Sequence, residues 1–201
     1  MFYSSFRVNT SEDVLGVELA GALKNVLAIA AGVVEGLGLG HNTMSALVTQ
    51  GLNEIRMLCE TMGADVHTIS GPAGAGDTML TCFVNLSRNR KVGVRLGSGE
   101  KLTDILGSMK EVAEGVPTAG VVVRLARKYR VPAPVVTTVA CILVSVISRL
   151  HRVDAQTAFW MQEERITPRE AVLKLMTFPQ IEEKEQERLA QKKRKAPEVT
   201  S

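Results

Sequence analysis

Apolar residues recur at helical spacing along the segment between Asp13 and the glycine series "EGLGLGHN". The repeating positions are Leu15, Leu19, Leu23, Val26, Ala30 and Val33. Steps of three and four place such residues on one face of an α-helix. Asp13 is a suitable N-cap, and a glycine series ends a helix. The sequence therefore predicts one long helix near the N-terminus.

Further helices are expected along most of the chain. A second helix should run from a cap at Asn42 or Thr43 to Gly63, which we expect to be a C′ glycine. The segment "GPAGAGDTMLTCFV" predicts a shorter helix after a glycine-rich loop, and another helix should begin with Ser87 as its cap. The remaining helices are predicted at Leu102–Met109, Pro117–Tyr129, Pro134–Arg149, Ala155–Gln162 and Pro168–Met176.

Both ends of the chain differ from this helical body. "FRVNT" is expected to be a short extended segment without sheet partners. From Gln180 onward, Glu and Gln are followed by Lys and Arg with few apolar residues, which is typical of a frayed helix or a flexible tail. We therefore divide the chain into an N-terminal segment, residues 1–12, a helical body, residues 13–178, and a charged tail, residues 179–201.

Composition argues against several classes of protein. The chain has 201 residues, 45% of them hydrophobic, and a net charge of only +3, which disfavours a nucleic-acid-binding surface. The uncharged stretch "VPAPVVTTVACILVSVIS" contains prolines and hydroxyl residues, so we expect a buried core helix and no membrane span. The three cysteines lie far apart in apolar surroundings, as in a reduced intracellular protein, and no His or Cys pair has metal-ligand spacing.

The stretch "GALKNVLAIAAG" places Lys24 and Asn25 among small and apolar residues. Together with Glu18, Gly21, Ala28 and Gly32, Asn25 forms a seam at helical spacing that a bulky group can approach. Close packing of two helices explains the small residues but not the polar pair. A cleft beside the seam explains the charge. Both interpretations stay open on these residues alone.

A second stretch, "GAGDTMLTC", begins a helix with Asp77. An aspartate at this position is an ordinary N-cap. Alternatively, Asp77 points into a cleft, with Thr81 one turn later on the same face, and orients a cation such as Lys24.

A third stretch, "NLSRNRKVG", places Ser87, Arg88 and Asn89 at the start of a helix. The cap, the free backbone N–H groups and the guanidinium together favour an anion site, with Arg90 and Lys91 adding positive charge. A plain basic surface turn is the alternative.

In this order, the three stretches and "EVAEGVPTA" resemble the C-terminal domain of NAD(P)-dependent glycerol-3-phosphate dehydrogenases, from about Phe6 to about Phe178. The resemblance implies an all-α fold, a multi-helix domain of the 6-phosphogluconate-dehydrogenase-like type with one residual N-terminal strand. It implies the NAD(P)-dependent interconversion of sn-glycerol 3-phosphate and dihydroxyacetone phosphate, with no metal ion.

The resemblance also assigns roles to individual residues. Lys24 falls on the family's proton donor and acceptor. Asp77, Asn25 and Thr81 match further catalytic positions, and we expect Lys24, Asp77, Thr81, Arg88 and Asn89 to surround one concave surface. Substrate-binding positions fall on Lys24, Asp77, Ser87, Arg88 and Asn89, and cofactor-binding positions on Arg88, Val112 and Glu114. The cofactor is NAD, with NADP as the alternative.

A complete member of this family carries a Rossmann domain before the matched segment. Without that domain we expect weak phosphate binding and little turnover, as in a truncated gene model, a relic or a fragment. Two functions therefore stay open. The chain is the substrate half of a dehydrogenase and forms a homodimer through its helices, or it is a silent helical module that pairs with itself or with a full-length subunit.

The cellular location is expected to be the cytoplasm. The charged tail resembles that of kinetoplastid members, which end in a peroxisomal tripeptide. This chain ends in Val199, Thr200 and Ser201, so a glycosome is only the alternative.

Overall fold

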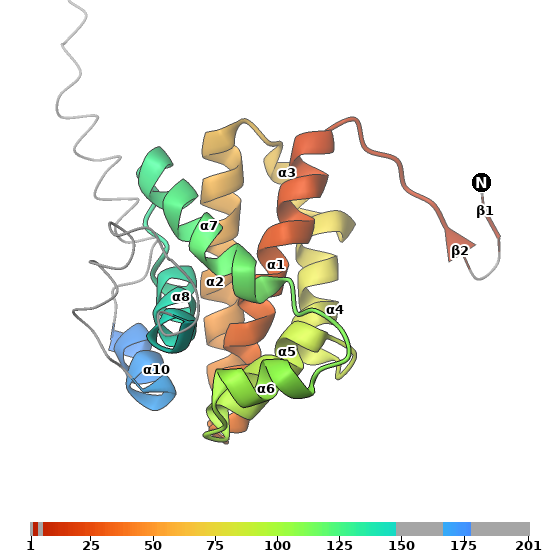
Figure 1. Cartoon of the computed structure of the whole chain (residues 1–201). Helices are drawn as coiled ribbons and strands as arrows, with labels where there is room; N and C mark the ends of the chain where they lie inside the picture. The colour runs from red at the N-terminus through yellow and green to blue at the C-terminus, as the bar shows by residue number, and fades with distance from the viewer. Residues whose placement is uncertain (1, 4–5, 148–166, 178–201) are drawn as a thin grey trace, which may run out of the picture.

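The computed structural model describes residues 2–3, 6–147 and 167–177, and the helical body forms around one central helix (Figure 1). The all-α class predicted from the sequence is confirmed for this body. Two short strands precede it, β1 (Phe2–Tyr3) and β2 (Phe6–Arg7), which pair antiparallel with Phe2 opposite Arg7. The expectation that "FRVNT" lacks a sheet partner is therefore wrong, because its first two residues, Phe6 and Arg7, pair with Tyr3 and Phe2.

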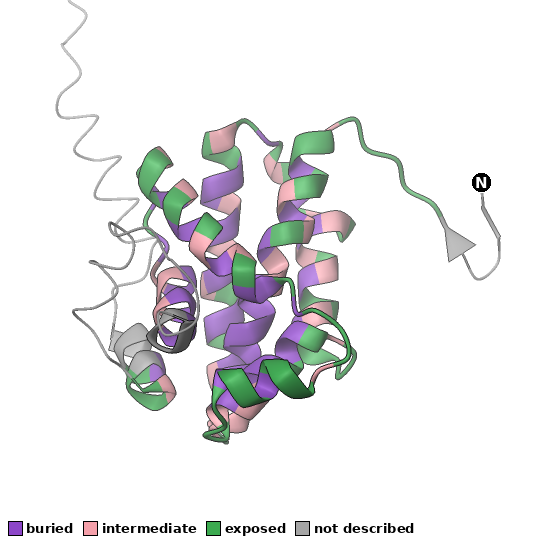
Figure 2. Ribbon diagram, in the orientation of Figure 1, coloured by how far each residue is buried: buried purple, intermediate pink, exposed green. Residues whose placement is uncertain are grey.

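The central helix α1 (Val14–Gly36) contacts α2, α4, α5, α7 and α8. Asp13 caps it as predicted, since its carboxylate accepts a hydrogen bond of 2.9 Å from the Gly16 amide. The second half of α1 is buried almost all round (Figure 2). By length and composition α1 could cross a membrane, but its burial among the other helices is that of a core helix.

Helix α2 (Gly40–Met62) begins earlier than its sequence suggests. The residue before it is Leu39, and the caps predicted at Asn42 or Thr43 are wrong. The Thr43 hydroxyl donates instead to the Leu39 carbonyl oxygen at 3.0 Å, one turn back along the helix. The other end is as predicted, because Gly63 follows α2 with a φ of 102° and donates its amide to the last turn.

Two short helical segments lie between α2 and α4. Helix α3 (Val66–Ser70) was not foreseen, and the glycine-rich segment expected to be a loop forms a π-helix, η1 (Pro72–Gly76). Helix α4 (Asp77–Phe83) follows directly, and α5 (Arg88–Gly97) begins after a cap at Ser87, as predicted.

Helices α1 and α5 approach each other backbone to backbone. Gly32 of α1 faces Gly93 of α5, and a Cβ at Gly93 would lie 2.9 Å from the Gly32 Cα atom. A side chain on either glycine would force the helices apart. The seam predicted from "GALKNVLAIAAG" is thus a helix-packing surface at its Gly32 end.

The remaining described helices are α6 (Leu102–Ser108), α7 (Gly115–Tyr129), α8 (Pro134–Ile147) and α10 (Pro168–Thr177). Each lies within a few residues of its predicted range. The helix predicted at Ala155–Gln162 lies outside the described residues, as does the charged tail. Val135, Val139 and Leu143 of α8 are buried, as expected of a core helix.

Cys59 and Cys82 are buried free thiols, as predicted, whereas Cys141 is only partly buried. Burial raises the pKa of both the Cys59 and the Cys82 thiols to about 12, so both stay protonated and unreactive at neutral pH.

Candidate active site

The Lys24 ammonium group of α1 forms an ion pair with the carboxylate of Asp77, the first residue of α4. The two side chains retain 20% and 35% of their exposure, so the pair is shielded but still open to solvent. Gly76 stands at the N-cap position, and no side chain caps this helix. Of the two interpretations of Asp77, the structure supports the one in which it orients a cation.

Thr81 supports Asp77 from one helical turn further along α4. Its hydroxyl lies 2.6 Å from the Asp77 carbonyl oxygen, to which it donates, and 3.4 Å from the carboxylate Oδ1 atom. Thr81 therefore stands beside the carboxylate that holds Lys24.

Asn25 and Asn89 join the lysine helix to α5. The Asn89 Nδ2 atom donates to Asn25 Oδ1 at 2.9 Å, and Asn89 Oδ1 accepts from the Gly115 amide at 2.8 Å. Asn89 is 7% exposed, so its side chain is a structural link inside the domain. This hydrogen bond explains why the apolar seam of α1 contains an asparagine.

Ser87 and Arg88 form the exposed beginning of α5. The Ser87 hydroxyl accepts a hydrogen bond of 3.3 Å from the Arg90 amide, which is the predicted capping contact. The Arg88 guanidinium is about half exposed and lies 3.2 Å from the carboxylate of Glu111. Arg90 differs from the prediction: it is buried and paired with Glu35, so it adds no positive charge to the solvent-facing surface.

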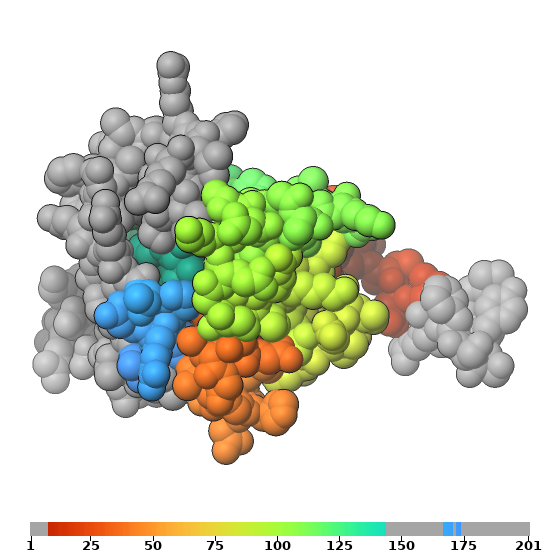
Figure 3. All heavy atoms as spheres, turned by 60° about the horizontal axis from the view of Figure 1, so that its bottom comes forward, coloured from red at the N-terminus to blue at the C-terminus, as the bar shows by residue number. Residues whose placement is uncertain are grey.

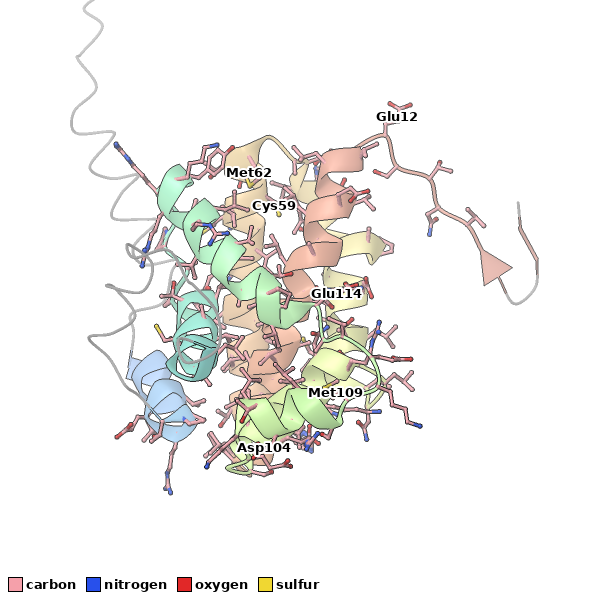
Figure 4. The ribbon with its side chains drawn as sticks, viewed as in Figure 1. Glu12, Cys59, Met62, Asp104, Met109 and Glu114 are labelled. Carbon is pink, nitrogen blue, oxygen red and sulfur yellow. The ribbon has the colours of Figure 1, made fainter. Side chains whose placement is uncertain are left out.

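Val112 and Glu114 lie in the segment between α6 and α7. Both are exposed. Met109 follows α6 at one end of this segment, and Glu114 immediately precedes α7 at the other end (Figure 4). The ion pair between Arg88 and Glu111 brings this segment beside the start of α5. Helices α5 and α6 lie next to each other on the face seen in Figure 3.

An open cleft of about 630 Å³ lies beside Asp77, between the segment before α1 and η1. Glu18, His67 and Thr68 line it, but Lys24, Thr81, Arg88 and Asn89 do not. The five residues expected around one concave surface are linked by hydrogen bonds or chain neighbours, yet only Asp77 borders this cleft. No sequence pattern groups His67 with Asp77, because it is the folding of α3 and η1 that brings both residues to this cleft.

Glu54 of α2 is a buried polar residue that the sequence analysis missed. Its carboxylate accepts hydrogen bonds from the Val135 and Val136 amides at the start of α8, at 2.8 and 3.1 Å. Burial raises its pKa to about 7, against the opposing effect of these bonds. Its position between Gly51, Ile55 and Leu58 on the buried face of α2 was the available signal.

Among the described residues, no group of three or more His, Cys, Asp or Glu side chains is arranged to hold a metal ion. Arg88 is an exposed guanidinium, the kind of group that pairs with the phosphates of a dinucleotide, and the exposed Val112 directly follows its partner Glu111 in the chain.

Comparisons with known proteins identify the family of this chain. Residues 13–150 match the family described as NAD-dependent glycerol-3-phosphate dehydrogenase C-terminus. The chain is 59% identical over 180 residues to the chloroplastic glycerol-3-phosphate dehydrogenase [NAD(+)] 2 of Arabidopsis thaliana, a match that covers 90% of this chain and 38% of the relative. It is 56% identical to the glycerol-3-phosphate dehydrogenase [NAD(P)+] of Geobacter sulfurreducens, over 69% of this chain and 42% of that protein.

The solved structures show the same relationship. The crystal structure of glycerol-3-phosphate dehydrogenase from Coxiella burnetii aligns with a TM-score of 0.75 and 34% identity, over 88% of this chain and 49% of that one. The chain thus spans less than half the length of these relatives. The resemblance seen in the sequence is confirmed: the chain belongs to the NAD-dependent glycerol-3-phosphate dehydrogenase family and corresponds to its C-terminal domain.

Proposed function

We propose that this domain provides the substrate-binding and proton-transfer half of a dehydrogenase that interconverts sn-glycerol 3-phosphate and dihydroxyacetone phosphate. The observation that carries the proposal is the ion pair between Lys24 and Asp77, which holds a partly exposed ammonium group in a fixed direction. A solvated surface lysine has no such constraint.

Lys24 is the proposed proton donor and acceptor. In the reductive direction its ammonium group gives a proton to the carbonyl oxygen of dihydroxyacetone phosphate, and in the oxidative direction its amine takes the proton of the hydroxyl group. The hydride at the carbon that bears this oxygen would come from, or pass to, a nicotinamide dinucleotide when one is bound. Asp77 and Thr81 keep the ammonium aimed, and Asn25 anchors the same turn of α1 to α5.

The beginning of α5 is the proposed phosphate site. Ser87 caps the helix by accepting from the Arg90 amide, the Arg88 and Asn89 amides stand before the first intrahelical hydrogen bond, and Arg88 offers a guanidinium fork to phosphate oxygens. Glu111 holds this guanidinium in the ligand-free domain, so a phosphate must compete with its carboxylate. Asn89 is the proposed third residue of this site; its mostly buried side chain holds Asn25 through Nδ2, and that amide nitrogen carries a second hydrogen that can be donated to a ligand.

We place the cofactor edge at Arg88, Val112 and Glu114, with NAD as the cofactor and NADP as the alternative. The plant and bacterial relatives are named for NAD(+) and NAD(P)+, respectively. The bacterial and chloroplastic relatives favour the cytoplasm, or a plastid, over a glycosome.

A pairing module is the second candidate function, and an apolar surface favours it. The residues Met79, Leu80, Phe83, Val84 and Leu86, on α4 and just after it, are all at least 40% exposed. Such a surface suits a homodimer or the remainder of a longer subunit. Sedimentation equilibrium gives the oligomeric state of the wild type and of the double variant Leu80→Ser, Phe83→Ser. If this surface mediates self-pairing, the wild type should be a dimer and the double variant a monomer.

The activity is tested in a fusion. The part of the Geobacter sulfurreducens relative that this chain does not match is joined ahead of Phe6, and NADH oxidation is measured with dihydroxyacetone phosphate. The 201-residue polypeptide alone provides the baseline. Turnover by the fusion supports the proposal. A folded fusion that binds NADH but oxidises none would contradict it.

A further inference from the structure

Arg90 is a buried cation in the first turn of α5. The residue retains only 7% of its exposure, although it stands two positions after the exposed Arg88. Taking a guanidinium out of water is costly unless its hydrogen bonds are replaced. The position therefore calls for a reason beyond packing.

The guanidinium of Arg90 joins three parts of the chain. One end nitrogen, Nη2, forms an ion pair with the Glu35 carboxylate near the end of α1. The other, Nη1, lies 3.4 Å from the Asn85 Oδ1 atom in the turn between α4 and α5. The positive charge also acts on Cys82 of α4, where it opposes the effect of burial on the thiol pKa.

The hydrogen bonding of Arg90 is incomplete. Its Nε atom is buried and has no partner among the described residues. A buried donor without a partner costs about 1–3 kcal/mol. A methionine of similar length would remove that unpaired donor, and it would leave no buried charge behind, because the Glu35 side chain is 41% exposed and can be hydrated. Stability alone does not account for an arginine at this position.

The turn that Arg90 touches leads directly into the proposed phosphate site. Asn85 is followed by Leu86, Ser87 and Arg88, and the Arg90 amide itself donates to the Ser87 cap. Both the side chain and the backbone of Arg90 thus hold this turn, and Glu35 connects it to α1, the helix that carries Lys24.

We propose that Arg90 is a positioning residue, which fixes the Asn85–Ser87 turn against α1 so that Ser87 and Arg88 present their donors to a phosphate group. This inference rests on the proposed function, and it assigns no ligand contact to Arg90 itself.

The test uses the 201-residue polypeptide and titrates it with inorganic phosphate and with sn-glycerol 3-phosphate by calorimetry. Arg90→Met should weaken binding of both about tenfold, equivalent to about 1.4 kcal/mol, with the melting temperature nearly unchanged. Arg90→Lys should restore part of the affinity, because its ammonium can still reach Glu35. Arg95→Met is the matched control. Arg95 also lies on α5, and its replacement removes the same charge together with an ion pair to Glu100. This variant should bind both anions like wild type.

A double-mutant cycle isolates the link through the turn. Asn85→Ala leaves the Arg90 charge in place but removes its contact to the turn. If Arg90 acts through Asn85, the double variant should bind no more weakly than Arg90→Met alone. Wild-type affinity in Arg90→Met, or an equal loss in Arg95→Met, would overturn the inference.

Failure of the proposed function gives a different result. If the wild-type domain binds neither anion, the phosphate site is refuted. The positioning role is then decided by amide NMR spectra, in which Arg90→Met should shift Ser87 and Arg88 while Arg95→Met does not.

Discussion

The Asn89 side chain donates a 2.9 Å hydrogen bond to the Asn25 side chain, across 64 positions of sequence. Its oxygen accepts from the Gly115 amide, so one buried side chain joins α1, α5 and α7. Lys24, the proposed proton donor, directly precedes Asn25, and Arg88, the proposed phosphate ligand, directly precedes Asn89. The distance between these two functional residues is therefore set by the buried hydrogen bond between the asparagines.

Replacing Asn89 by aspartate should break this link with almost no change in shape. The new carboxylate places an acceptor opposite Asn25 Oδ1, and rotating the Asn25 amide would instead lose its bond to the Gly21 carbonyl oxygen. We expect Asn89→Asp to lower the free energy of unfolding by about 1–3 kcal/mol. Urea denaturation near pH 8 provides the measurement. Asn42→Asp, exposed in the first turn of α2, makes the same chemical change and should stay within about 0.5 kcal/mol of wild type.

Two glycine-to-alanine substitutions should have opposite effects on stability. A Cβ at Gly93 would press on the backbone of α1 beside Gly32, whereas a Cβ at Gly21 meets no atom within 4 Å. Gly93→Ala should therefore destabilise the domain by about 1–3 kcal/mol through overpacking. Gly21→Ala should stabilise it by about 0.5–1 kcal/mol through helix propensity. Thermal unfolding of both variants measures the difference, and a loss at Gly21 as large as that at Gly93 would contradict this account of the packing.

Local signals explain which helix ends were predictable. Asp13, Gly63 and Ser87 cap helices with their own side chain or backbone, so the sequence showed them. Leu39 stands at the N-cap position of α2 and makes no side-chain capping bond, and the nearby Asn42 and Thr43 misled the assignment. A helix that starts without a capping side chain leaves no mark in the sequence.

The candidate site was predictable only in part, because its connections are long-range. The sequence around Asp77 suits an N-cap as well as a residue that orients a cation. Only its contact with Lys24, 53 positions away, decides between these two roles. Arg90 looked like part of a basic surface because its sequence neighbours are charged. Its burial depends on the course of α1, which places Glu35 beside it. The contact between Asp77 and Lys24 was among the predictions, whereas the hydrogen bond between Asn89 and Asn25 was not.

Glu54 should make stability depend on pH. Burial raises its pKa to about 7 from the ordinary value of 4.5 for a glutamate, so between these values the folded state holds a proton that the unfolded state has released. Its contribution to stability is complete below pH 4.5 and is lost as the pH rises through about 7. The slope from this one group is at most about 1.4 kcal/mol per pH unit.

The comparison with Glu54→Gln isolates this effect. The glutamine amide cannot accept from both the Val135 and Val136 amides, so the variant should lose some stability at every pH. Relative to that constant loss, it should gain on wild type as the pH rises from 4.5 to 7. Chemical denaturation at several pH values provides the two curves, and parallel curves would show that Glu54 does not titrate in this range.

Lys24 should be required for proton transfer and not merely for charge. In the fusion, Lys24→Arg keeps a cation for Asp77, but a guanidinium does not release its proton at neutral pH. Lys24→Met keeps the length and loses both charge and proton. Both variants should lower kcat for dihydroxyacetone phosphate by about 100- to 10,000-fold, the usual range for a general acid or base. Lys101→Met, an exposed lysine just before α6, is the control and should retain kcat. If Lys24→Arg oxidised NADH at the wild-type rate, Lys24 would be an electrostatic residue, and another group would have to move the proton.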